Sequence, residues 1–414
     1  MTSSTRWLTT CLALLLALCP VAAPQALAHD PVAPLVRTGR TPELTPQQLA
    51  GQRVIFSYSG PTPPDSLLQD IRAGRAAGVV LFRQNISSPA QLAAVIGQLR
   101  QAQQESPIRL PLLLMTDQEG GLVRRLPGAP ELSERRIGQA ADPAATAAQA
   151  GTGAGQNLTS LGLNVNLAPV LDVYDTPDNF IDHAQRSYSQ DPAVAADAGS
   201  AFITAQQQAG VAATAKHFPG LGSAPSGQST DETPVTLPVA LETLRTVDEA
   251  PYPAAIAAGV KLVMLSWAVY PALDPDHPAG LSPAVVGGEL RGRLGYHGVT
   301  ITDGLEAHAL RGVGTTGRRA LAAALAGMDL LLCSGKETIQ GEDATTALAD
   351  ALTDGRLDRG AFTAAANRVN ELRAGLHRPS IEGEPPSALY RDPACGFSCS
   401  PPEAPHRTGQ ALGR

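Results

Sequence analysis

Residues 211–238 read VAATAKHFPGLGSAPSGQSTDETPVTLP. The stretch begins with small and apolar residues and reaches a basic pair, Lys216–His217, which is typical of a buried strand that ends in charged side chains. A Phe-Pro-Gly turn and a long polar loop follow, and this loop carries Asp231 and Glu232. Long polar loops at the ends of strands are frequent places for binding and catalysis. The stretch therefore predicts a buried strand whose end forms the rim of an active site.

The same pattern of a short apolar run before a helical segment recurs along the chain. The eight runs are 53–58, 78–82, 110–116, 163–169, 211–217, 261–267, 298–302 and 329–333. Ala/Leu-rich segments between them, 239–258 included, are expected to form helices, and several have the Ser-Pro or Asp-Pro starts and Gly ends that suit helix termini. Eight such units predict an α/β fold, a (β/α)8 TIM barrel over residues 44–378, with its chemistry at the C-terminal ends of the strands. An open doubly wound sheet is disfavoured because residues 57–60, SYSG, are not a Gly-rich phosphate-binding turn.

The first 28 residues have the pattern of a secretory signal peptide. Arg6 precedes the apolar run CLALLLALC, and the Ala-x-Ala site at 26–28 predicts cleavage before His29. The run is short for a membrane-spanning helix, so we expect a secreted, extracellular protein with no stable transmembrane anchor. A lipoprotein anchored through Cys19 is less favoured, since bulky Leu18 precedes this cysteine.

The two ends of the mature chain are polar and rich in proline. We expect residues 29–43 to form a surface leader and residues 379–414 to form a disordered tail. Cys395 and Cys399 in that tail could form a disulfide or stay unpaired. Cys333 lies in the apolar run DLLLC and is predicted to be a buried free thiol.

The composition also restricts the partners. A net charge of -7 disfavours nucleic acid, whose phosphates need a cationic surface. Cys and His do not occur at the spacing of a metal site, and no cofactor motif is present, so we expect neither a metal nor an organic cofactor. We expect the protein to be a monomer.

Ionisable residues follow several of the predicted strands. Asp117 follows 110–116, Lys216–His217 end 211–217, and Asp303 follows 298–302. Asp172 follows 163–169, and the loop after it carries Asp182, His183 and Arg186. A single Asp after a strand often caps the next helix. Several such residues on one face of a barrel favour an active site instead.

In sequence the chain resembles glycoside hydrolase family 3, and in particular its single-domain bacterial β-N-acetylglucosaminidases. The matching segments are TDQEGGLVRRL (116–126), LNVNLAPVLDV (163–173), QRSYSQDP (185–192), AKHFPGLG (215–222), YPALDP (270–275), LSPAVVGGELRGRLGYHGVTITDGLE (281–306) and AGMDLLL (326–332). The resemblance implies a retaining hydrolysis of terminal, non-reducing β-linked N-acetylglucosamine. For a secreted protein, the implied substrates are chito-oligosaccharides and cell-wall fragments.

The resemblance also implies roles for individual residues. Asp303 stands at the position of the nucleophile, and the sugar-binding positions fall on Asp117, Arg125, Arg186, Lys216 and His217. We expect Lys216 and Arg186 to lie near Asp303 and to keep it ionised. Glu119 and Arg124 are expected to brace their loop. A Schiff base on Lys216 is the chemical alternative that the residues alone leave open.

The loop after Phe218 departs from the family pattern. In these relatives the loop ends in Asp-Ser-His, where the histidine is the acid/base and the Asp polarises it. Here the corresponding residues are Asp231, Glu232 and Thr233, and a threonine hydroxyl cannot serve as an acid/base near neutral pH. Asp231 and Glu232 are therefore the candidate acid/base residues. A weak hydrolase, a β-glucosidase-type specificity and an inactive carbohydrate- or cell-wall-binding protein are the alternatives.

Overall fold

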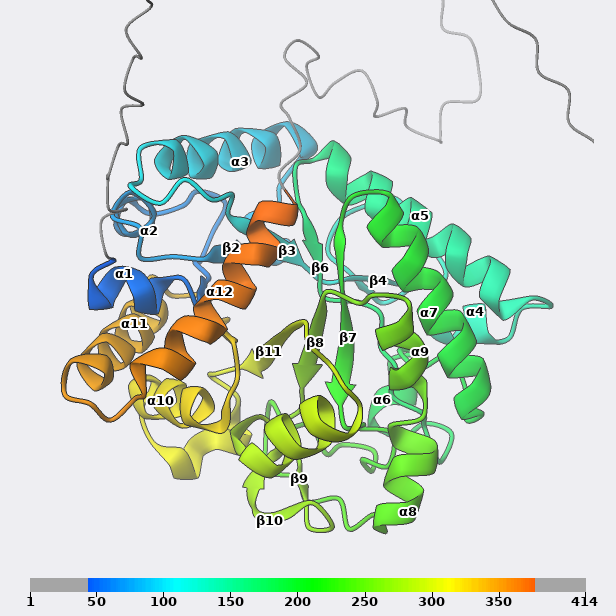
Figure 1. Ribbon diagram of the computed structural model, residues 1–414. Coiled ribbons are helices and arrows are strands. Elements are labelled where there is room, and N and C mark those ends of the chain that lie inside the picture. Colours follow the sequence, from blue (N-terminus) through cyan, green and yellow to red (C-terminus); the bar gives the residue numbers. More distant parts are fainter. Residues whose placement is uncertain (1–43, 377–414) are drawn as a thin grey trace, which may run out of the picture. The chain divides into compact units, whose positions relative to one another are not determined.

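The computed structural model describes residues 44–376 (Figure 1). The signal peptide, the leader and the Pro-rich tail with Cys395 and Cys399 lie outside the described residues. Among those described, Cys333 is a buried free cysteine, as expected. In the part of the chain that the structure describes, none of the helices is both long and apolar enough to cross a membrane.

Eight parallel strands form a closed barrel, which confirms the predicted fold. In order around the barrel they are β1 (Val54–Phe56), β12 (Leu330–Leu332), β11 (Val299–Gly304), β8 (Leu262–Leu265), β7 (Ala212–Phe218), β6 (Val165–Asn166), β3 (Leu113–Thr116) and β2 (Gly78–Val80). Each strand falls within or overlaps one of the eight apolar runs. Strands β3 and β11 are four places apart in the closed order of eight, so they face each other across the barrel.

Apolar side chains from all eight strands fill the barrel interior. Ile55, Met115, Val165 and Ile301 belong to one buried cluster inside it. Branched and unbranched aliphatic side chains packed in this way remove apolar surface from water, which is the main favourable term in folding. The barrel is therefore a packed core, and a ligand site has to lie at one of its two ends.

Helix α12 (Arg359–Gly375) covers the end of the barrel where the strands begin. Its Val369 and Leu372 join the interior cluster. Buried Arg373 donates hydrogen bonds to the carbonyls of Leu110 and Pro111, immediately before β3. The carboxyl ends of the strands thus remain as the end available to a ligand.

The helices around the barrel begin as their sequences predict. In α3 (Pro89–Gln104), the Ser88 hydroxyl accepts a hydrogen bond from the Gln91 amide, and Pro89 follows this cap directly. Asp191 caps α7 (Pro192–Gln208) in the same way. Figure 1 shows α5 (Pro143–Ser160) and α7 side by side on the green flank of the barrel.

One predicted helix and one loop differ from the expectation. Residues 239–258 do not form a single helix but α8 (Leu241–Thr243), a π-helical turn and α9 (Pro251–Ala257). Pro251 has no main-chain N–H, so it begins a helix more easily than it continues one. After β3 the chain forms an unpredicted hairpin of β4 (Gln118–Gly120) and β5 (Val123–Arg124). Positive φ angles at Gly120 and Gly121 allow its tight turn.

Candidate active site

The predicted site residues come together at the carboxyl ends of the strands. Asp117 directly follows β3, Lys216 and His217 lie near the end of strand β7, and Asp303 lies near the end of β11. Arg186 comes from the loop after α6 (Phe180–His183), and Arg125 follows the β4–β5 hairpin. The barrel therefore brings residues that are far apart in the sequence to one face.

A network of ion pairs connects most of these residues, and buried Glu119 is at its centre. The Arg186 guanidinium binds Glu119 with two hydrogen bonds of 2.9 Å each. The Lys216 Nζ atom lies 2.7 Å from Glu119 Oε1 and 3.2 Å from Asp117 Oδ1. Arg125 in turn lies 3.2 Å from Asp117 Oδ2. Glu119 thus braces the cationic side chains themselves, whereas the sequence suggested only that it braces a loop.

The pKa values of this network follow from its charges. Burial pushes the pKa of Glu119 up, but Arg186 and Lys216 outweigh it and hold the pKa at about 2. Burial acts on the Asp117 carboxyl in the same direction, and Lys216 and Arg125 reverse it, so its pKa lies below the ordinary value. Burial lowers the pKa of Lys216, yet Glu119 and Asp117 raise it above its usual range. The network is therefore fully ionised at neutral pH.

This network predicts a loss of stability in acid. Because the pKa of Glu119 is lower in the folded chain than in the unfolded one, Glu119 stabilises the fold above pH 4.5. That contribution is lost as the pH falls from about 4.5 towards about 2. In Glu119→Gln we expect a lower melting temperature at pH 7, since Arg186 and Lys216 each lose an ion pair to Glu119, and a weaker dependence on pH in this window. Thermal unfolding at a series of pH values measures both, with the exposed Glu242→Gln as a control. Equal pH dependence in Glu119→Gln and wild type would contradict the prediction.

His217 has a buried partner to which the sequence assigned no role. The Asp172 carboxylate is fully buried, and its Oδ2 atom lies 2.7 Å from His217 Nδ1. Its Oδ1 atom accepts hydrogen bonds from the main-chain amides of His217 and Leu221, at 3.1 and 2.7 Å. A carboxylate here favours the tautomer with the proton on Nδ1, which leaves Nε2 to face a ligand. The position of Asp172 directly after a predicted strand was the signal for it in the sequence.

We expect Asp172→Asn to impair turnover while the chain stays folded. The amide can still accept the two main-chain hydrogen bonds, but its NH2 group opposes the proton on His217 Nδ1. A misplaced ring in an active site costs about 10²-fold in rate. The check is the pH profile of kcat/KM, which should change in shape together with the rate. A profile identical to that of the wild type would mean that Asp172 does not set the state of His217.

Asp303 is a half-buried carboxylate at the end of β11. Its Oδ1 atom accepts a hydrogen bond of 2.8 Å from the Gly304 amide, and the Gly304 carbonyl accepts one from Trp267 Nε1, also at 2.8 Å. No helix begins at residue 305, so the alternative role of Asp303 as a helix cap is wrong. The strand end and the buried tryptophan thus fix the position of this carboxylate.

The charges around Asp303 differ in part from the expectation. Burial raises its pKa above the ordinary value, with a further increase from Asp231 and opposing effects of His217 and Lys216. Arg186, which we expected to act on Asp303, is engaged by Glu119 instead. Lys216 does favour the ionised form, but burial is the larger effect, so the carboxylate stays more basic than an exposed one.

Main-chain hydrogen bonds hold the loop that carries Asp231 against the segment that follows β11. The His308 amide donates to the Asp231 carbonyl at 3.0 Å, and the Ala309 amide donates to the Thr230 carbonyl at 3.1 Å. Further along, Leu237 and Val269 are joined in the same way at 2.9 Å. Asp231 is exposed, and its charge acts on Asp303. Glu232 is also exposed, but it is not among the charges that shift the pKa of Asp303.

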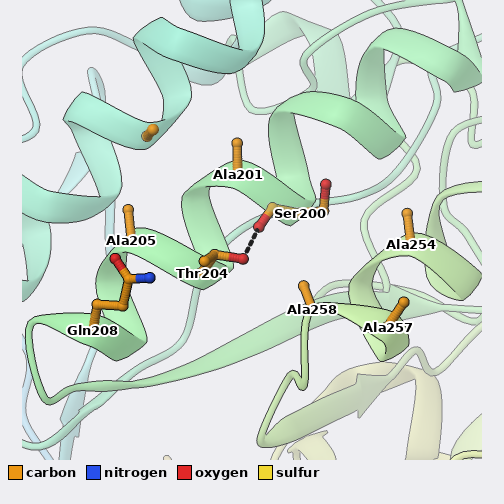
Figure 2. A pocket seen from close by; sticks show the side chains of 9 residues that line it. Ser200, Ala201, Thr204, Ala205, Gln208, Ala254, Ala257 and Ala258 are labelled. Carbon is orange, nitrogen blue, oxygen red and sulfur yellow. Dashed lines mark hydrogen bonds between the residues drawn. The ribbon is translucent and has the colours of Figure 1, made fainter.

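A depression elsewhere on the surface lacks the groups for such chemistry. It lies between α7 and α9, has a volume of about 500 Å³, and is lined mainly by alanines (Figure 2). Ser200 and Thr204 also line it, and the Thr204 hydroxyl donates to the Ser200 carbonyl at 2.9 Å. Its lining includes no ionisable side chain. The strand ends are therefore the better candidate for an active site.

Comparisons with known proteins show the family to which the chain belongs. The glycosyl hydrolase family 3 N terminal domain matches residues 48–372. A secreted glycosyl hydrolase of Arthroderma benhamiae is 44% identical over 79% of this chain and 93% of its own. A beta-hexosaminidase of Xylella fastidiosa is 36% identical over 72% of this chain and 87% of its own.

Solved structures give the same result. A glycoside hydrolase family 3 beta-N-acetylglucosaminidase from Paenibacillus has a TM-score of 0.78 and 35% identity, and the match covers 84% of this chain and 66% of that one. A beta-N-acetylhexosaminidase from Beutenbergia cavernae has a TM-score of 0.73 and 32% identity, covering 80% of this chain and 99% of that one. The chain therefore belongs to glycosyl hydrolase family 3 and is a glycosidase of the β-hexosaminidase type.

Proposed function

We propose that the protein releases terminal, non-reducing β-linked N-acetylglucosamine by a two-step retaining mechanism in which Asp303 is the nucleophile. The observation that carries the proposal is the environment of Asp303, a half-buried carboxylate at a strand end beside His217, Lys216 and the loop that holds Asp231. The amino-sugar preference rests on the relatives, because the names of two of them specify β-hexosaminidase and β-N-acetylglucosaminidase activity.

In the first step the Asp303 carboxylate attacks the anomeric carbon, and the bond from that carbon to the leaving oxygen breaks. A nearby acid gives its proton to this oxygen, and a glycosyl ester on Asp303 is formed. In the second step the same group, now a base, takes a proton from water, and the water oxygen replaces the ester. Two carboxyl groups are sufficient for this sequence, which needs no cofactor.

Asp231 is the better candidate for the acid/base. Its main chain is tied to the segment that follows Asp303, and its charge acts on Asp303, whereas Glu232 has neither feature. In the family relatives, the loop that ends in Asp-Ser-His supplies the proton donor. We assign the same function to the altered loop of this chain, with Asp231 as the donor. Closure over a sugar would desolvate this exposed carboxyl and raise its pKa, as a proton donor requires.

The ion-pair network suits the hydroxyl groups of a sugar. Asp117 can accept from two neighbouring hydroxyls, while Arg125, Arg186, Lys216 and His217 offer donors around it. Because Glu119 and Asp117 already pair with Arg186 and Lys216, these cations do not require a carboxylate from the ligand and can donate hydrogen bonds to an uncharged sugar. With the predicted signal peptide, this activity would act outside the cell on chito-oligosaccharides or cell-wall fragments.

The test compares 4-nitrophenyl β-N-acetylglucosaminide with the matching β-glucoside. We expect a higher kcat/KM for the amino sugar and a product that first appears as the β-anomer by NMR. A preference for the glucoside would mean a β-glucosidase, and sugar binding without release of nitrophenol would mean a carbohydrate-binding protein. Either result would overturn the proposal.

A further inference from the structure

A cavity of about 340 Å³ lies next to the sugar site, on the side of Asp117. It is bordered by the segment between β2 and α3, by the residues that follow β5, and by Leu161 at the end of α5. Three arginines, Arg83, Arg124 and Arg125, line it, and its lining has no acidic side chain from residues 44–376. A cavity with this lining favours an anion.

The positive charges of Arg83 and Arg124 are not matched by carboxylates among the described residues. Arg83 donates to the carbonyl of Arg124 at 3.1 Å, and Arg124 donates to the carbonyl of Gly128 at 2.7 Å. Carbonyl oxygens orient a guanidinium but carry no net charge. Both side chains therefore have donors and unneutralised charge to offer to a ligand.

The beginning of a helix also lies at this cavity. Ser88 and Pro89, at the start of the long helix α3, line the cavity as well. The positive end of a helix dipole stabilises an anion placed there. The arginines and the helix end thus both favour an anionic ligand.

The barrel topology fixes which part of a bound sugar would face this cavity. Arg125 is shared, because it lines the cavity and also binds Asp117 after β3. Asp303 lies on β11, opposite β3 in the closed barrel. A pyranose whose C1 lies at Asp303 therefore directs its opposite side, C4 and the exocyclic C6, towards Asp117 and Arg125. A substituent on that side is the one that can reach Arg83 and Arg124.

We infer that the cavity is a subsite for an anionic substituent, in particular a phosphate monoester on the 6-position of the terminal sugar. The inference rests on the orientation of the sugar in the proposed function. A phosphate offers oxygens to the fork of each guanidinium, which is the geometry that arginine recognises best. The oxygen on the exocyclic C6 lies further from the ring than the hydroxyl oxygens that are attached directly to ring carbons, so a phosphate on it reaches further. The subsite would let the enzyme accept phosphorylated amino sugars as well as plain ones.

Calorimetry tests the inference without requiring turnover. We measure the Kd of N-acetylglucosamine 6-phosphate and of plain N-acetylglucosamine at equal ionic strength, in wild type, Arg83→Gln and Arg124→Gln. In the wild type we expect the phosphate ester to bind about 10-fold more tightly than the plain sugar. In Arg83→Gln this ratio should fall towards unity while the Kd of the plain sugar stays the same. Arg109→Gln is the matched control, since exposed Arg109 also donates to a main-chain carbonyl but lies outside the cavity lining.

The outcomes separate this inference from the proposed function. If the ester binds no better than the plain sugar, or if its advantage persists in both Arg83→Gln and Arg124→Gln, the subsite does not exist. Inorganic phosphate could instead bind in the cavity beside the plain sugar. If it tightens the binding of the plain sugar while the ester binds no more tightly than the plain sugar alone, the cavity binds a free anion and the inference fails. If the advantage of the ester depends on Arg83 but the nitrophenyl substrate is not hydrolysed, the subsite stands and the proposed hydrolysis fails.

Discussion

Replacing Asp303 by alanine should lower kcat for 4-nitrophenyl β-N-acetylglucosaminide by on the order of 10⁴-fold or more, as expected for loss of a nucleophile. Such a loss corresponds to about 5 kcal/mol of transition-state stabilisation. The physical reason is that the Gly304 amide and Trp267 fix the Asp303 carboxylate at the end of β11, a position that alanine leaves without a nucleophile. The fold should survive, because removing a half-buried carboxylate whose pKa is raised by burial also removes its desolvation cost.

Azide provides the sharper version of this experiment. A small anion can occupy the space of the missing carboxylate and attack the anomeric carbon from the same face. We expect azide to restore part of the activity of Asp303→Ala and to yield an α-glycosyl azide. Glu306→Ala, which removes an exposed carboxylate close by in the sequence, is the matched control and should retain turnover. An Asp303→Ala protein as active as wild type would remove Asp303 from the mechanism.

Replacing Asp231 by alanine should reduce kcat/KM for a natural disaccharide by about 10²–10⁴-fold, the usual contribution of general acid catalysis. The loss should be much smaller for the nitrophenyl glycoside, because nitrophenolate leaves without needing a proton. Glu232→Ala is the control, since it removes a neighbouring exposed carboxylate that exerts no resolved effect on Asp303. If Glu232→Ala shows the selective loss and Asp231→Ala does not, the two roles are reversed.

The pH profile gives an independent measure of the same pair. Asp231 raises the pKa of Asp303, so removing its charge should lower that pKa. Asp303 has to be ionised to attack, and activity is lost as the pH falls through its pKa. The acidic limb of kcat/KM on the nitrophenyl substrate should therefore move to lower pH in Asp231→Ala and stay in place in Glu232→Ala. An unmoved limb in both variants would show that the Asp231 charge does not reach the nucleophile.

Much of the fold could be predicted because it depends on local patterns. Each strand is a short apolar run, and the helix starts at Ser88 and Asp191 carry their own caps. The helix predicted at 239–258 failed at Pro251, where one residue without an N–H divides it. The β4–β5 hairpin was missed because its residues are charged and glycine-rich, so they lack the alternation of a strand.

The sequence indicated many of the residues that the structure brings together at the site. It did not indicate which acidic side chain would pair with which basic one. Strand ends and the family resemblance indicated Asp117, Lys216 and Asp303, but not which acid would pair with which base. Glu119 proved to be the partner of Arg186 and Lys216, and Asp172 that of His217. Pairing depends on where side chains from different strands meet, and a single sequence does not contain those distances.

The main-chain anchors of the Asp231 loop have a consequence for protein engineering. His308, Ala309 and Val269 hold this loop through its backbone amides and carbonyls, so its position does not depend on which side chains it displays. Substitutions at Glu232 and Thr233 should leave the fold intact, and Thr233→His would place a histidine close to Asp231. Different proton donors could then be introduced into this loop and their activities compared while the barrel stays the same.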